Sequence, residues 1–196
     1  MERSALYRRA LAPTVAAVGI TGVVGSSIGI VVGVGGVIGF VVHWLVVAVG
    51  ALLAALWVVR RQALGAGEAF WSSPTKRVAA ALMPAFLSGG LVAILGLGQL
   101  FKVQTVLVLP GLWMLFYGCA LHSAGFFTPR GLRLFGWIFL GMGTIWLCIY
   151  LNFTPWLPFG IQDPTRNAHA LMGAVFGLGH LAYAVYLHLT ERKNVA

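Results

Sequence analysis

The chain has 196 residues, of which 60% are hydrophobic and 9% are charged, and its mean hydropathy is +0.92. An average soluble domain carries about 25% charged residues, so this composition excludes an ordinary water-soluble protein. The net charge of +9 comes without a basic stripe interleaved with exposed aromatics, so no nucleic-acid partner is expected.

Apolar runs long enough to cross a bilayer follow one another along almost the whole chain. About 20 helical residues span a hydrocarbon core of roughly 30 Å, and a helix satisfies its own backbone polar groups in lipid. We therefore predict an all-α, polytopic integral membrane protein, a single six-helix bundle over residues 1–196. The expected spans are 11–34, 37–59, 78–100, 105–127, 134–153 and 168–189.

The first span carries a regular series of small residues. Gly25, Gly29 and Gly33 recur every four residues, a spacing that lets two helix backbones approach closely. We predict a helix-packing face here. The pattern does not decide whether its partner is another helix of the chain or a second copy.

The third and sixth spans share a short sequence match. Residues 81–93 and 170–182 are identical at six of thirteen aligned positions. The two spans cross in opposite directions, so a true relation would be an inverted 3+3 repeat. A composition rich in Ala, Leu and Gly produces such matches as well, and both explanations stay open.

The second and fourth spans each contain one histidine within their apolar sequence. His43 lies in the second span, and His122 lies in the fourth, which also carries Trp113 and Tyr117. We interpret these two aromatic side chains as lining a ligand pocket or a packing groove.

The sixth span carries two histidines, His169 and His180, eleven residues apart. At 100° per residue, eleven residues return to within about 20° of the same helix face. Gly173 and Gly177 lie between them, and we expect a shallow groove with an imidazole at each end. A flat b-type haem could use such a groove, with histidines as its axial ligands.

Partners for such ligands exist on other spans. Estimated depths match His122 with His180, whereas His43 and His169 match less well. A divalent metal held by His43, His169 and Asp163 is a further alternative. Hydrogen bonding between helices also explains intramembrane histidines, so our expectation is no metal and no resident cofactor, with haem b as the alternative.

Basic residues are distributed very unevenly between the two sides of the membrane. Only Lys102 and Arg166 fall on the side opposite the amino terminus. The other side carries eleven: Arg3, Arg8, Arg9, Arg60, Arg61, Lys76, Arg77, Arg130, Arg133, Arg192 and Lys193. The positive-inside rule therefore predicts a cell inner-membrane protein with both termini in the cytoplasm.

All four carboxylates, Glu2, Glu68, Asp163 and Glu191, lie outside the expected spans. This argues against ion-coupled transport by a buried acid. We expect a small non-catalytic accessory, sensory or regulatory subunit that binds an apolar ligand or a membrane partner, the partner being another protein or a second copy. The alternatives are a b-type haem electron-transfer protein and a small-solute transporter or flippase with inverted repeats.

Overall fold

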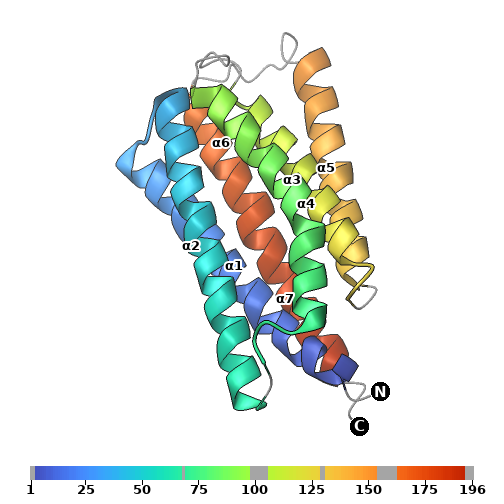
Figure 1. Ribbon diagram of the computed structural model, residues 1–196. Coiled ribbons are helices and arrows are strands. Elements are labelled where there is room, and N and C mark those ends of the chain that lie inside the picture. The colour runs from blue at the N-terminus through green and yellow to red at the C-terminus, as the bar shows by residue number, and fades with distance from the viewer. Residues whose placement is uncertain (1–2, 68, 98–105, 129–130, 154–162, 193–196) are drawn as a thin grey trace.

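The computed structural model describes residues 3–67, 69–97, 106–128, 131–153 and 163–192, and every regular element in these ranges is helical. The all-α class is therefore confirmed. The helices are α1 (Arg3–Val32), α2 (Gly36–Gly65), α3 (Ser73–Leu97), α4 (Val108–Ala124), α5 (Gly131–Phe153) and one continuous last helix made of α6 (Pro164–Met172), η3 (Gly173–Leu178) and α7 (Gly179–Arg192), as Figure 1 shows.

Five of these helices are long and apolar enough to cross a membrane, judged by length and composition. The qualifying segments are Leu11–Val32, Gly36–Gly65, Thr75–Leu95, Gly131–Asn152 and Pro164–Thr190. Helix α4 is also apolar but has 17 residues, which is at the short end of the range that spans a bilayer. The chain is thus a multi-pass membrane protein whose helices contact lipid.

The last helix lies inside the bundle, with α1 running antiparallel along it (Figure 1). Its beginning is fixed by Asp163, whose Oδ1 accepts a hydrogen bond of 2.9 Å from the backbone N–H of Arg166. Pro164 occupies the first helical turn, where its missing N–H costs nothing. This capping role for Asp163 explains the carboxylate without a metal.

Small residues set the contact between α1 and the last helix. A Cβ atom placed on Gly22 would lie 3.0 Å from Cα of Gly177, and one placed on Gly173 would collide with Oγ of Ser26. One placed on Gly29 would collide with the imidazole of His169. The small-residue face of α1 is therefore used within the chain.

The other two glycines of that predicted face have different neighbours. Gly25 faces Val47 of α2, where an added Cβ would lie 2.6 Å from Cγ2. Gly33 does not belong to the face, because it follows the end of α1 with φ of +72° and an added Cβ would meet nothing within 4 Å. The hydrogen bond from the N–H of Val34 to the carbonyl of Gly29 closes the helix there, so the four-residue spacing ends in a cap.

Two groups of buried side chains make up the core, one toward each end of the bundle. One group joins α2 to α6 through Phe40, Trp44, Ala168 and Met172. The second group consists of residues from α1, α4, α5 and the last helix: Ala12, Val15, Met114, Leu121, Ala124, Leu132, Phe135, Phe139, Val175, Tyr183, Ala184 and Leu187. His169 lies next to the first group, and His180 lies next to the second.

Candidate functional site

His169 is fully buried and uses both ring nitrogens within the protein. The indole Nε1 of Trp44 donates to Nδ1 at 3.0 Å, and an indole N–H can only donate, so this nitrogen carries no proton. The proton of the neutral ring therefore lies on Nε2, which donates to the carbonyl oxygen of Val34 at 3.1 Å. If His169 coordinated a haem iron or another metal ion, one of these two hydrogen bonds would have to break.

His43 lies beside His169, with ring centroids 5.1 Å apart and the ring planes at 83°. Its Nε2 is 2.8 Å from the carbonyl oxygen of Gly25 on α1, and since a carbonyl only accepts, Nε2 is the donor. The two histidines thus link α1, α2 and α6 by hydrogen bonds. Among the described residues no group of three or more His, Cys, Asp or Glu side chains could hold a metal ion.

His180 lies in a separate aromatic environment against α4 and α5. Its Nε2 is 2.7 Å from the hydroxyl oxygen of Tyr117, and its ring contacts Phe135, Phe139 and Phe176 at centroid distances of 5.1, 5.5 and 6.3 Å. The side chain is 1% exposed. Tyr117 and His180 therefore form a buried polar pair enclosed by phenylalanine rings.

The expected pairing of the histidines differs from the one observed. His43 and His169 are neighbours, whereas His122 contacts Phe126 and the exposed Trp137, and no contact between His122 and His180 is present in the described part of the chain. The depth estimate fails for His169 because its helix begins at Pro164, so the residue lies about 8 Å inside the helix rather than at its start.

The expected groove between His169 and His180 is also not open. Gly173 and Gly177 both face α1, as described above, and that helix fills the space. The two histidines do not share a face, because the π-helical stretch η3 lies between them and accommodates an extra residue in the turn. One extra residue rotates His180 by about 100° relative to a uniform α-helix.

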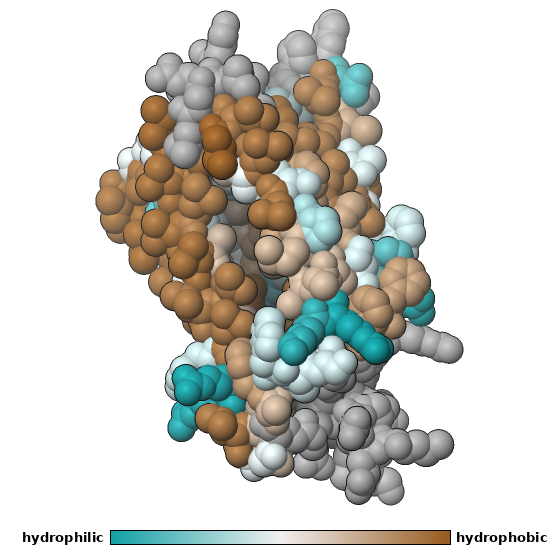
Figure 2. Space-filling view, in the orientation of Figure 1, coloured by the Kyte–Doolittle hydropathy of each residue, from teal (hydrophilic) through white to brown (hydrophobic). Residues whose placement is uncertain are grey.

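A different opening lies between α2 and α3. The buried residues of α2 are Val37, Phe40, Val41 and Trp44, and none of the remaining residues of this helix is buried. On α3 the only buried residue among the described side chains is Ala93, which packs in the same group as Val41. The two helices therefore meet near one end and diverge toward the other, and Figure 2 shows the surface hollowed between them.

Small side chains on both helices leave this space unfilled. Ala48, Ala51 and Ala55 follow Trp44 on α2 at the spacing of one helix face. On α3, a Cβ atom added to Gly90 would meet nothing within 4 Å, although Ala93, one turn further on, is fully buried. We call this space the α2–α3 hollow.

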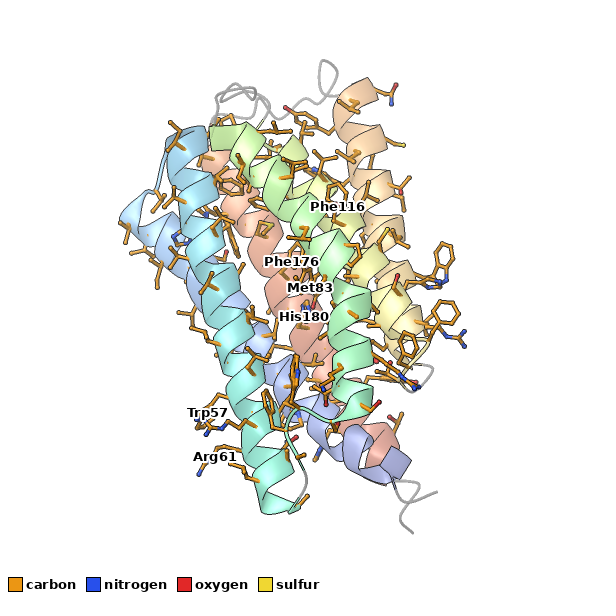
Figure 3. The ribbon with its side chains drawn as sticks, viewed as in Figure 1. Trp57, Arg61, Met83, Phe116, Phe176 and His180 are labelled. Carbon is orange, nitrogen blue, oxygen red and sulfur yellow. The ribbon has the colours of Figure 1, made fainter. Side chains whose placement is uncertain are left out.

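The inner side of the α2–α3 hollow is aromatic. In the view of Figure 3, Met83 of α3, Phe176 and His180 project into the region between α2 and α3. Tyr117 connects these parts, because its ring stacks on Phe86 of α3 at 6.2 Å and contacts Phe176 at 5.4 Å. The Tyr117–His180 pair therefore borders the hollow from the side of the bundle interior.

Trp113, the other aromatic residue predicted to line a pocket or groove on α4, lies one turn before Tyr117 and contacts α3. Its Nε1 donates to the carbonyl oxygen of Gly89 at 3.2 Å, and its ring stacks on Phe40 at 5.9 Å. Sequence reasoning missed Phe176 and Gly90. The Gly89–Gly90 pair in the middle of an apolar helix was the signal available for Gly90, because glycine there leaves either a close approach or a gap.

No protein-family model, curated protein sequence or solved structure matches the chain.

Proposed function

We propose that this chain is a small non-catalytic membrane protein that takes up an apolar ligand from the bilayer through the α2–α3 hollow and acts as an accessory, sensory or regulatory subunit. The observation that carries the proposal is the divergence of α2 and α3 beside the half-buried Phe176, whose ring contacts both members of the buried Tyr117–His180 pair. A ligand dissolved in lipid can reach such an opening sideways without crossing water.

The chemistry of the surrounding side chains supports ligand binding more than electron transfer. His169 and His43 each donate a ring N–H to a backbone carbonyl, and Nε2 of His180 is engaged by Tyr117. An iron ligand at His169 or at Nε2 of His180 would break these interhelical bonds. The haem alternative is correspondingly weaker, and a hollow bordered by apolar and aromatic groups favours a hydrophobic molecule.

We also propose that the protein resides in a cell inner membrane with both termini in the cytoplasm, since eleven of its thirteen basic residues fall on that side. The start of α1 and the end of α7 lie at the same end of the bundle in Figure 1, as this orientation requires. The inverted 3+3 repeat, and with it the transporter alternative, stays a prediction from the match between residues 81–93 and 170–182.

Native mass spectrometry of the protein released from membranes tests the proposal. We expect the wild type to retain a bound apolar molecule, and the variant Gly90→Leu to lose it because the added side chain fills the α2–α3 hollow. The matched control is Gly141→Leu, which adds the same side chain to an exposed glycine of α5 where an added Cβ meets nothing within 4 Å.

Two outcomes would contradict the proposal. The first is a wild-type protein that carries no apolar molecule after gentle release and binds none from a membrane extract. The second is a Gly90→Leu variant that retains as much of the molecule as Gly141→Leu does.

A further inference from the structure

We infer that the ligand of the α2–α3 hollow carries a flat ring with a carbonyl oxygen, as lipophilic quinones do, and that the Tyr117–His180 pair donates a hydrogen bond to this oxygen. The inference rests on the function proposed above and names the chemical class of its ligand. Four observations lead to it: the proton count of the pair, the unpartnered nitrogen of His180, the surrounding rings and the depth of the site.

The proton count of the Tyr117–His180 pair leaves one donor over. If the hydroxyl of Tyr117 donates to Nε2, the neutral imidazole carries its proton on Nδ1. If Nε2 donates to the hydroxyl oxygen instead, the hydroxyl hydrogen is left. In both arrangements the pair keeps one N–H or O–H in excess, and a ligand acceptor satisfies it; in the second arrangement Nδ1 is unprotonated and is an additional acceptor.

The protein does not satisfy the pair from its own described residues. Nδ1 of His180 is buried and has no hydrogen-bond partner there. The backbone carbonyl of Phe176, one turn earlier, lies close to the ring but at a geometry too poor for a hydrogen bond. An unpaired polar group in an apolar interior is costly, so binding an acceptor here is favourable.

The rings around the pair suit a flat ligand. Phe86 lies parallel to Tyr117 at an interplanar angle of 8°, while Phe176 and Phe139 meet the same ring at 64° and 63°. Such walls offer stacking and edge contacts to a planar ring. Phe86 is 38% exposed, so a ring in the hollow can contact it directly, whereas a hydrogen bond to the buried pair requires Phe86 or Phe176 to move aside.

The depth of the pair favours a quinone over a glycerophospholipid. Tyr117 lies nine residues from the start of α4 and seven from its end, or about 13 and 10 Å along the axis. The ester carbonyls of phospholipids lie at the headgroup boundary, roughly 15 Å from the bilayer centre. A carbonyl on an uncharged, lipid-dissolved ring can reach the middle of the membrane. No charged side chain contacts the pair in the described part of the chain, which agrees with a neutral ligand.

The experiment compares two soluble probes on the purified protein: a short-chain prenyl benzoquinone and the prenyl benzene that lacks both carbonyls. Binding is followed by competition against the retained apolar molecule in native mass spectrometry. We expect the quinone to bind about tenfold more tightly than the benzene, as one buried hydrogen bond would give. Equal affinities for the two probes would overturn the inference.

Variants distinguish the contribution of the hydrogen bond to binding from the contribution of the hollow itself. Tyr117→Phe combined with His180→Phe removes both possible donors of the pair and should abolish the preference for the quinone, whereas Tyr186→Phe, on an exposed tyrosine of α7, should keep it. A preference that survives in this double variant would also overturn the inference. If both probes bind equally and Gly90→Leu blocks both, the ligand class is wrong while the proposed function stands. If neither probe nor any apolar molecule binds the wild type, the proposed function fails as well.

Discussion

The indole nitrogen of Trp44 lies 3.0 Å from Nδ1 of His169, and this contact sets the protonation of the imidazole. Because the indole can only donate, the proton of His169 is directed to the carbonyl oxygen of Val34, next to the cap of α1. His169, which the sequence suggests as a haem ligand, therefore connects α2, α6 and the α1–α2 turn by hydrogen bonds.

The first prediction concerns haem. Both ring nitrogens of His169 are hydrogen-bonded, and His43 donates to the carbonyl of Gly25. Coordination of a haem iron by these histidines would therefore break hydrogen bonds between helices. Protein expressed with ample haem supply and purified in detergent should show no Soret band, whether oxidised or reduced with dithionite. A Soret band that disappears in His169→Ala or His180→Ala would refute this prediction.

The second prediction concerns the Trp44–His169 bond. Trp44→Phe keeps an aromatic ring but leaves a buried acceptor without its donor, which should lower the free energy of unfolding by about 1–2 kcal/mol. Denaturation in mixed detergent micelles measures this value. The control is Trp137→Phe, since Trp137 is 60% exposed on α5 and should change stability little.

A double-mutant cycle with His169→Phe sharpens that test. Once the acceptor is gone, Trp44→Phe should cost less than it does in the wild type, giving a coupling energy of about 1 kcal/mol. Purely additive effects would mean that the two side chains do not interact as described.

The third prediction concerns the crossing of α1 and the last helix. An added Cβ on Gly22 would lie 3.0 Å from backbone atoms of Gly177, which cannot rotate aside. Gly22→Ala should therefore destabilise the protein by about 1–3 kcal/mol. Gly141→Ala, at an open position of α5, should instead stabilise it slightly because alanine is the better helix former. The same sign for both variants would contradict this packing.

The sequence predicts the helices well but their partners poorly. All-α structure and helices within the expected spans follow from apolar length, because backbone groups in lipid must bond within their own helix. Which faces meet depends on the exact start and the regularity of each helix. The Asp163–Pro164 dipeptide signals a helix start four residues before the expected one, whereas no sequence rule reveals the π-helical stretch Gly173–Leu178.

The candidate site shows the same limit. Tyr117 and His180 are visible in the sequence as polar groups in apolar spans, but their contact at 2.7 Å joins residues 63 positions apart. The α2–α3 hollow exists because Ala51, Ala55 and Gly90 are too small to fill it. Small residues pack closely in some helices and leave gaps in others, and only the arrangement of the neighbouring helices decides between these outcomes.

The fourth prediction concerns orientation. With Cys119 and Cys148 replaced by Ser, single cysteines are introduced at Ala69, in the α2–α3 connection, and at Asn167, near the start of α6. In intact cells a membrane-impermeant maleimide should label only the cysteine at position 167, and opening the cells should expose the one at position 69. The reverse pattern would show that the protein faces the other way.

We propose that a lipid-dissolved molecule occupies the α2–α3 hollow, and photolabelling in native membranes is the sharpest test of this proposal. An alkyl chain bearing a diazirine is added, activated by light, and its adducts are located by mass spectrometry of the digested protein. Exposed residues such as Ile145 on α5 should be labelled in any case. We expect a further adduct at the half-buried Phe176, which should be lost in Gly90→Leu and kept in Gly141→Leu. Labelling confined to the outward faces, with none at Phe176, would contradict it.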